Sequence, residues 1–526
     1  GFIYSQKDIR LASPGGQIQF SFHLTDGSPF YNVSFKNKAL VNNSSLGLDF
    51  LETGEFGKNL KIAKPVFRNG EEDYELIVGK TRSVHQVYHE VVIPLEEKNS
   101  PFRTINFVVR AFDDGLAFRY DFPEQKNWSQ FSLTNERTTF NLAGDPNVLA
   151  LFLPNYTSSH EGVYTDLPFS KIKEDTLMDM PALLEFEGPV YVAITEANLF
   201  DYAGMYLSKE KNVLVSKLSP LPHQTEIKVK ATLPHHSPWR VLMMSDRIGT
   251  LIESNILTTL SEPCKLKDVS WIKPGKTTFP WWNGNVVPDT INAPGNNFVT
   301  NQYYIDFCAR NGLEYHSVVE YGLHQWYTDD GVGFQPGPHS DVTTPVPGLD
   351  MKEICDYATA HGVGVRVWVH WAALYPKLDT AFAIFEKWGL KGMMVDFMDR
   401  DDQEMVNMQT EILQKAAQHH LHIQFHGAYK PTGESRTYPN EYTREGTLNY
   451  EVNKWGHITP DHDLNIVFTR ALAGTTDYHL GGFRAVPDSL FRIQYTRPLM
   501  LGTRCHMLAM YVVLQNALSM VCDYPE

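Results

Sequence analysis

The second half of this chain is best understood from the stretch Gly392-Met-Met-Val-Asp-Phe-Met-Asp-Arg-Asp-Asp402. Its first residues form an apolar run without polar alternation, which is typical of a strand buried on both faces of a parallel sheet. The run ends at Asp396, and residues 403–418 then have the pattern of a helix. In a parallel α/β barrel the carboxyl ends of the strands carry the chemistry. We therefore expect Asp396 at the mouth of such a barrel.

The sequence around this stretch alternates apolar strands with helices at the spacing of βα units. Strands are expected at residues 278–283, 315–321, 363–370, 392–396, 422–426 and 448–451, with closing segments near Thr476 and at 517–523. Helices are expected at residues 301–311, 351–361, 381–388 and 403–418, and Asp350 can cap the second of them. Residues 266–526 are thus predicted to form a (β/α)8 barrel of the TIM type.

Residues 1–265 have a different pattern of apolar and turn residues. Short alternating apolar runs, such as residues 105–110 and 189–194, are separated by turn residues at the regular spacing that antiparallel sandwiches show. We therefore predict two domains, an N-terminal β-sandwich at 1–265 and a barrel at 266–526. The chain begins at Gly1 without an initiator methionine and ends directly after the last expected strand. We expect that a preceding segment was removed and that the natural polypeptide continues.

The composition is that of a globular protein, with 42% hydrophobic and 20% charged residues. A formal net charge of -15 argues against a nucleic-acid partner, because that partner needs a basic face. No apolar run has the length that a membrane span requires. A neutral or weakly charged small molecule is the substrate that fits best.

In the expected barrel, one strand end after another delivers a polar or aromatic side chain to the same mouth. Carboxylates beside tryptophans suit a sugar, because its C–H face packs on aromatic rings and its hydroxyls form charge-assisted hydrogen bonds. A purely packing role for the tryptophans stays open. The residues concerned are Trp281, Trp282, Glu320, Tyr321, His370, Trp371, Asp396, His426, Glu451 and Asp477. Of these we expect Trp281, Glu320, His370 and His426 to bind substrate.

Cleavage of a glycosidic bond asks for two carboxyl groups, one that protonates the leaving oxygen and one that attacks or activates water. Asp396 and Glu451 are the pair that we select. Asp399, Asp401 and Asp402 compete with Asp396, but their position suits capping of the helix that begins at residue 403.

Further carboxylates suggest a cation. Glu445 precedes Glu451 by six residues on a turn, and carboxylate oxygens suit Ca²⁺. In the N-terminal half Glu161 and Glu196 stand out, because each follows or interrupts an apolar run. A surface position or an ion pair is the alternative for both, since isolated acids are rarely buried.

These residues resemble glycoside hydrolase family 97, and the likeness covers the whole chain. The segments that carry it are residues 194–202, 395–399, 425–427, 432–440 and 444–451. The resemblance implies a β-sandwich followed by a catalytic barrel. It also implies one of two mechanisms, which differ in the position of a carboxylate.

Inverting α-glucosidases of the family carry base glutamates after the third and fifth barrel strands, where this chain has His370-Trp371 and His426-Gly427. Retaining members carry an aspartate nucleophile after the fourth strand, which Asp396 matches, while Glu451 matches the acid/base. The pattern therefore resembles the retaining α-galactosidases, which are exo-acting on small or oligosaccharide α-galactosides. An inverting α-glucosidase and a non-catalytic glycan-binding protein are the alternatives.

The resemblance further implies Ca²⁺ beside the acid. Glu445 and Glu451 match ligand positions, and Glu196 or Glu161 is the candidate ligand from the N-terminal domain, with Glu196 also expected near the substrate. A secreted or periplasmic location follows from the habit of the family. For a retaining enzyme the two catalytic carboxyl groups should lie ~5 Å apart.

Overall fold

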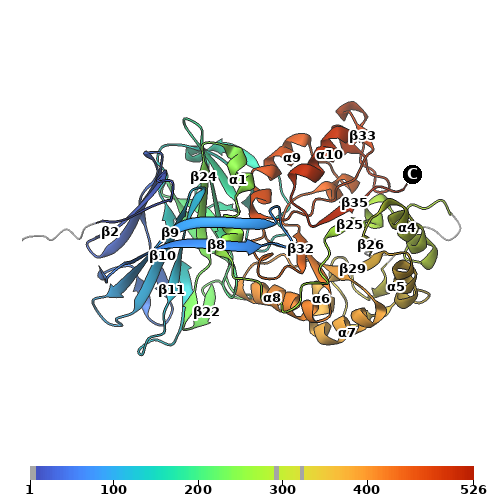
Figure 1. The fold of residues 1–526 in the computed structure, drawn as a ribbon, viewed down its shortest axis with the longest axis horizontal. Helices are drawn as coiled ribbons and strands as arrows, with labels where there is room; N and C mark the ends of the chain where they lie inside the picture. Colours follow the sequence, from blue (N-terminus) through green and yellow to red (C-terminus); the bar gives the residue numbers. More distant parts are fainter. Residues whose placement is uncertain (1–7, 290–294, 320–324, 526) are drawn as a thin grey trace, which may run out of the picture.

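The computed structural model describes residues 8–289, 295–319 and 325–525. The expected site residues Glu320 and Tyr321 lie outside these ranges. Two parts lie side by side along the long axis of the molecule, a sheet-rich N-terminal part and an α/β C-terminal part (Figure 1). Within the described residues, no helix combines the length and the apolar character that crossing a bilayer requires.

The N-terminal part is built from antiparallel sheets. Its largest described sheet contains β7 (Leu60–Ile62), β8 (Val66–Glu75), β9 (Ser83–Glu97), β10 (Thr104–Phe112), β11 (Gly115–Phe122), β14 (Asn147–Ala150), β16 (Thr165–Pro168), β18 (Ala182–Phe186), β19 (Val190–Ala197), β23 (His235–His236) and β24 (Trp239–Ser245). A second sheet has the order β1 (Ile9–Ala12), β2 (Ile18–Thr25), β3 (Ser28–Phe35) and β4 (Lys38–Ser45).

Two smaller sheets complete this part. One contains β5 (Leu48–Phe50), β6 (Gly54–Phe56), β12 (Gln130–Glu136) and β22 (Val229–Thr232). The other contains β13 (Thr139–Phe140), β15 (Phe152–Leu153), β17 (Leu177–Met178), β20 (Met205–Glu210) and β21 (Val213–Leu218). The short helices α1 (Ile248–Glu253) and α2 (Ile256–Leu260) follow at the junction with the second part.

The alternating sequence pattern produces the sandwich. In β3 the residues Tyr31, Val33 and Phe35 are buried, and the residues between them are partly exposed. The ring of Tyr31 lies 5.2 Å from that of Phe118 on β11, so the second sheet packs on the largest one. This face-to-face packing of two antiparallel sheets confirms the predicted β-sandwich.

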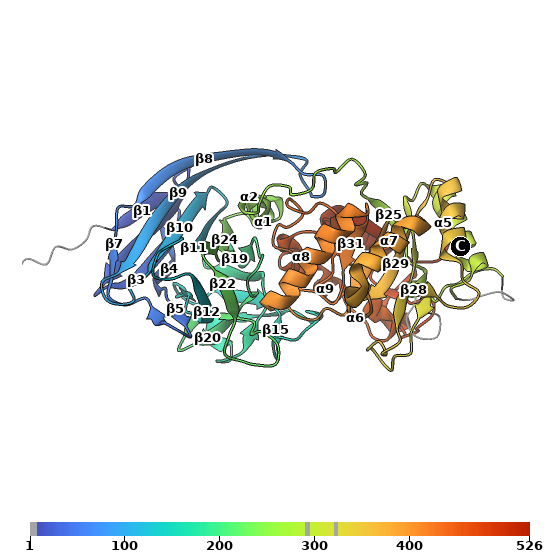
Figure 2. The ribbon, with the colours of Figure 1, turned by 90° about the horizontal axis from the view of Figure 1, so that it is seen from below.

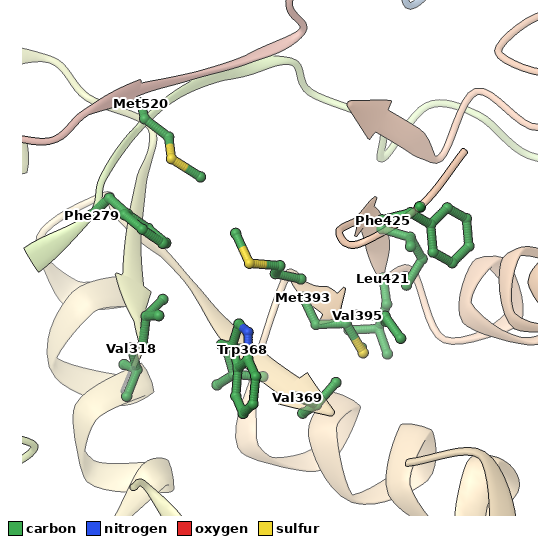
Figure 3. Close-up of a cluster of buried hydrophobic side chains, with 14 of the residues drawn as sticks. Phe279, Val318, Trp368, Val369, Met393, Val395, Leu421, Phe425 and Met520 are labelled. Atoms are coloured by element: carbon green, nitrogen blue, oxygen red, sulfur yellow. The ribbon is translucent and has the colours of Figure 1, made fainter. Parts of the chain in front are cut away.

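The C-terminal part is a nearly closed barrel of parallel strands. Their order around the barrel is β32 (Glu441–Arg444), β31 (His422–Phe425), β30 (Gly392–Asp396), β29 (Gly364–His370), β26 (Tyr315–Val318), β25 (Gly275–Thr278) and β35 (Leu518–Val521). Figure 3 shows buried side chains of these strands in one core, among them Val318, Trp368, Met393, Phe425 and Met520. The TIM-type barrel is therefore confirmed.

Backbone hydrogen bonds close the gap between β32 and β35 without a regular strand. The N–H of Asp477 donates to the carbonyl of Arg444, and the N–H of Cys522 donates to the carbonyl of Leu480. The expected strand near Thr476 is thus an extended segment that bridges its neighbours. Asp477 reaches the barrel interior, where Gln424 donates to it and Arg366 in turn donates to Gln424.

Helices cover the barrel, and their caps follow from the sequence. Asp350 and Asp402 each accept hydrogen bonds from two backbone N–H groups at a helix N-terminus, as predicted for Asp350. The helices are α3 (Pro280–Asn283), α4 (Phe298–Asn311), α5 (Met351–Ala360), α6 (Trp371–Leu374), α7 (Leu378–Trp388), α8 (Gln403–Gln418), α9 (Pro460–Val467) and α10 (Arg504–Val513).

Two strand predictions were wrong in position. The first strand ends at Thr278, and the segment from Pro280 forms α3, because proline suits the first turn of a helix. The sixth strand is β32 rather than residues 448–451, which run into the 3-10 helix η3 (Tyr450–Lys454). The domain boundary at residue 265 lies between β24 and β25 and stays a prediction.

The sandwich contacts the loops at the mouth of the barrel. The N–H of Ser158 donates to the carbonyl of Asp399 at 2.8 Å, and that of Gly204 donates to Asp401 at 2.8 Å. The long hairpin of β8 and β9 arches from the sandwich towards β32 (Figures 1 and 2). At its end Glu72 lies 2.8 Å from Arg436 of the barrel part.

A fully buried charge network crosses the same junction. Arg240 lies 2.6 Å from Glu136 and 2.7 Å from Glu196, and Lys430 of the barrel part donates to the other oxygen of Glu196. Two carboxylates without these cations would be left as buried, unpaired charges. The network therefore holds the end of β19 to the loop that follows β31.

Arg240→Ala should destabilise the protein by about 3–5 kcal/mol, because one arginine neutralises two buried carboxylates. Thermal unfolding followed by circular dichroism measures the effect as a lower melting temperature. Arg10→Ala is the control, since Arg10 is exposed and its nearest acid, Asp8, is 3.7 Å away. A melting temperature of Arg240→Ala equal to that of the control would contradict the role of the network.

Candidate active site

A cavity of about 710 Å³ lies at the carboxyl ends of the barrel strands and includes residues of both domains. Its acidic lining consists of Glu161, Asp396, Asp399, Glu445 and Glu451. Its aromatic lining consists of Phe279, Trp281, Phe334, Trp368, Phe397, Trp455 and Tyr495. Carboxylates among aromatic rings are the lining that suits a sugar.

Asp396 is the last residue of β30. The indole N–H of Trp368 donates to one carboxylate oxygen at 2.8 Å, and the N–H of Phe397 donates to the other at 2.5 Å. Burial raises the pKa of Asp396, but the charge of His426 and these hydrogen bonds outweigh it, so that the pKa lies below its ordinary value. Asp396 is thus held ionised and in a fixed orientation.

His426 follows β31 and lies among three carboxylates. Its Nδ1 is 3.4 Å from Asp396, and its Nε2 is 3.0 Å from Glu445 and 3.4 Å from Asp477. Burial lowers the pKa of His426, but Glu445 and Asp396 raise it by more, to well above the ordinary value. His426 is therefore an imidazolium whose positive charge is shared by the acids around it.

Glu445 directly follows β32. The N–H of Gly427 donates to one of its oxygens and the amide of Asn449 to the other, each at 2.7 Å. Burial raises the pKa of Glu445 well above the ordinary value, although His426 lowers it. The position of this carboxylate is therefore fixed by two neutral donors and one charged donor.

Glu451 lies in the first turn of η3, where Asn449 accepts a hydrogen bond from its N–H at 2.8 Å. Burial raises the pKa of Glu451 well above the ordinary value, and the nearby charge of Glu161 raises it further. Glu451 thus favours the protonated form, whereas Asp396 in the same cavity favours the ionised form. Such divergence between two carboxyl groups separates an acid from a base or nucleophile.

A group that could hold a metal ion lies beside this pair. Ligand atoms of His426, Glu445 and Glu451 all lie within 4.8 Å of one another. Burial is the main reason that the pKa of both glutamates is raised, and the charge of Glu161 adds to it, so a divalent cation here would meet several carboxylates. The protonated His426 has no lone pair to offer, but the carboxylate oxygens of Glu445 and Glu451 are ligands that a hard cation prefers, so these two residues fit Ca²⁺.

Two predicted site residues are not among those that line the cavity. Glu196 is fully buried against Arg240 and Lys430. Glu161, the alternative from the same domain, lines the cavity instead. His370 uses Nδ1 to cap α6, and its Nε2 contacts the carbonyl of Phe334. Their roles in binding a substrate or a cation stay predictions.

The remaining predicted residues Trp281, His426, Asp396, Glu445 and Glu451 come together in the cavity. Asp402 caps α8 as expected. Asp399 does not cap the helix but lines the cavity, and burial together with the charge of Asp396 raises the pKa of Asp399 to about 6.

Sequence reasoning missed His479, whose ring stacks on that of His426 at 5.3 Å. Its Nδ1 lies 3.5 Å from Glu451. It also missed Trp455 and Tyr495. Neither had a usable signal, because residues 448–451 were expected as a strand and Tyr495 lies in a loop without any pattern.

Known proteins resemble this chain in both domains. The profile described as Glycosyl-hydrolase 97 N-terminal matches residues 11–263, and that described as Glycoside hydrolase 97 matches residues 281–447. A relative named retaining alpha-galactosidase, from Bacteroides thetaiotaomicron, is 28% identical over an alignment of 554 positions. The alignment covers 100% of this chain and 80% of the relative. A probable retaining alpha-galactosidase of Streptomyces bingchenggensis is 28% identical, over 90% of this chain and 69% of that relative.

Solved structures agree with these matches. A family 97 enzyme of Pseudoalteromonas sp. strain K8, in complex with acarbose, superposes with a TM-score of 0.89 at 28% identity, covering 98% of this chain and 81% of that one. A beta-arabinopyranosidase shares the fold, with a TM-score of 0.83 at 22% identity, over 99% of this chain and 83% of its own. The two profiles together match most of the chain, residues 11–263 and 281–447, and the chain therefore belongs to glycoside hydrolase family 97.

Proposed function

We propose that this protein is a retaining exo-α-galactosidase that cleaves terminal α-galactosides. The observation that carries the proposal is the position of two carboxyl groups in one cavity. Asp396 ends β30 and accepts two N–H donors on its carboxylate, and Glu451 lies in the first turn of η3, where burial raises its pKa. The names of the Bacteroides and Streptomyces relatives support galactose as the sugar.

In the first step Asp396 attacks the anomeric carbon while Glu451 gives its proton to the departing glycosidic oxygen. This step forms a covalent β-galactosyl-aspartate and breaks the bond to the leaving group. In the second step Glu451 takes a proton from water, whose oxygen displaces Asp396 and releases α-galactose. Trp368 and His426 orient Asp396 throughout, because both contact its carboxylate.

We further propose that Glu445 and Glu161 hold a Ca²⁺ ion and that Glu451 is at most a partial ligand. A cation in full contact with Glu451 would lower its pKa and make it a poorer acid. When bound, the ion supplies positive charge beside the acidic lining of the cavity. The residues of the chain fix its place, since Glu445 is oriented by Gly427 and Asn449.

The first-formed sugar should be α-galactose when an aryl α-galactoside is hydrolysed. Two successive displacements restore the original configuration, whereas a single attack by water inverts it. Proton NMR recorded in the first minutes distinguishes the anomers before mutarotation mixes them. Initial formation of the β-anomer would favour the inverting mechanism, and no turnover of any α-glycoside would favour a glycan-binding protein.

Asp396→Ala should lower kcat/KM by about 10⁴-fold or more, as removal of a nucleophile does in other hydrolases. Azide should restore turnover of an aryl α-galactoside and give β-galactosyl azide, because azide then attacks the face that Asp396 occupied. Glu451→Ala is the matched comparison and should give α-galactosyl azide, since its covalent intermediate still forms. Identical azide products from both variants, identified by NMR, would refute the assignment of roles.

Ca²⁺ should raise the melting temperature of the wild-type protein relative to protein in EDTA, because a ligand that binds only the folded state stabilises it. At a concentration 100 times the Kd the gain is about 2.7 kcal/mol. Glu445→Gln should lose this increase. Glu196→Gln should melt lower but keep the increase, because Glu196 lies outside the proposed site. The proposal fails if Glu445→Gln keeps the full increase.

A further inference from the structure

One wall of the cavity exposes large aromatic rings to water. Trp455 is 50% exposed and Tyr495 is 55% exposed, and both line the cavity. The ring of Trp281 lies 6.4 Å from that of Trp455 in an edge-to-face arrangement. Exposed large apolar side chains that gather beside a polar pocket mark a binding surface, whereas isolated ones need no explanation. We refer to Trp281, Trp455 and Tyr495 as the aromatic wall.

The aromatic wall is held rigid by one buried lysine. The ammonium group of Lys454 donates to the carbonyls of Trp281, Trp282 and Tyr495 at 2.9, 2.8 and 2.9 Å. These three bonds use all the protons of the group. The same nitrogen lies 4.7 Å from the ring of Trp281 and 3.9 Å from that of Tyr495. Three separate chain segments are thereby fixed before any ligand arrives, which reduces the entropy lost on binding.

The aromatic wall lies on the side of the proposed acid. Glu451 is in η3, and Trp455 is the residue that ends η3, with its N–H donating to the carbonyl of Val452. The indole of Trp282 donates to the carbonyl of Tyr450 at 3.0 Å, which joins α3 to the same turn. Trp368 of β29 instead contacts Asp396. Since the acid protonates the departing oxygen, the leaving group must lie on the side of the aromatic wall.

The size of the cavity agrees with this placement. Its volume of about 710 Å³ falls in the range of pockets that enclose ligands of drug size, which are larger than a single hexose. A galactose beside Asp396 therefore leaves room for a further group beside Trp455. The C–H face of a second sugar ring packs favourably on an indole or phenol ring.

We infer that Trp281, Trp455 and Tyr495 form the binding site for the leaving group, and that this group is a sugar ring. The substrate class is thus the galactosyl disaccharides and oligosaccharides rather than galactosides of small alkyl groups. This inference rests on the proposed function, because it places the leaving group relative to Glu451.

The test compares two substrates that share the galactosyl group and differ in what departs. A galactosyl-α-1,6-glucose disaccharide releases a sugar ring, whereas α-galactosyl fluoride releases an ion that cannot stack. Values of kcat/KM are used because they report the steps up to departure of the leaving group. Trp455→Ala should lower kcat/KM for the disaccharide by about 10-fold more than for the fluoride, which is the scale of one aromatic contact.

Three further variants control the result. Trp455→Phe and Tyr495→Phe keep a ring and should retain most of the preference for the disaccharide. Trp271→Ala is the matched tryptophan control, because Trp271 does not line the cavity and its indole donates to the carbonyl of Asp268. It should leave the ratio of the two substrates unchanged. Melting temperatures show whether each variant is folded.

Equal losses for both substrates, or no loss for either, in a folded Trp455→Ala variant would overturn the inference. Failure of the proposed function looks different, because the wild-type protein would then cleave neither galactoside. In that event maltose and α-glucosyl fluoride replace the pair, and the same ratio tests the aromatic wall for a glucosidase. If the wild-type protein cleaves neither pair, the inference falls with the proposed function.

Discussion

The site depends on one buried positive charge. His426 contacts Asp396, Glu445 and Asp477 at 3.0–3.4 Å and is held protonated by them. The pKa of Glu445 stays raised by burial in spite of this charge. The pKa of Asp396 is lowered, because His426 and two N–H donors outweigh burial, so Asp396 remains ionised although it is buried.

The same charge divides two carboxyl groups into different roles. Asp396 touches His426 and receives two further N–H donors, whereas Glu451 faces Glu161 and lies 3.5 Å from His479. Burial lowers the pKa of His479 even though Asp477 opposes the change, so His479 offers Glu451 little positive charge. In the proposed mechanism, this difference in environment separates the carboxyl group that donates a proton from the one that attacks the anomeric carbon.

The fold was largely predictable from the sequence, and the site was predictable where side chains follow strands directly. Alternation predicted the sandwich, and apolar runs predicted β29, β30 and β31 with Asp396 and His426 at their ends. The sixth strand was misplaced because Glu441–Arg444 is polar in sequence and yet buried, its charges paired with one another at 2.6 Å. Periodicity detects burial only through apolar residues.

Residues on irregular backbone were beyond prediction. Asp399 has a positive φ of 46° and lines the cavity instead of capping α8. Glu196 and Glu161 looked alike in sequence, because each is an isolated acid near an apolar run. Their surroundings differ because Arg240 and Lys430, distant in the chain, form ion pairs with Glu196. Such pairings depend on how two domains dock, which no local pattern encodes.

The junction between the two parts also has a consequence for the order in which they fold. Loops of the barrel part near Asp399, Asp401 and Thr432 obtain backbone partners from the sandwich, through Ser158, Gly204 and Asn198. Domains generally fold as units, with the N-terminal one first during synthesis. The sandwich would then already be folded when the barrel part leaves the ribosome. The loops at the mouth of the barrel would form their backbone hydrogen bonds on its surface.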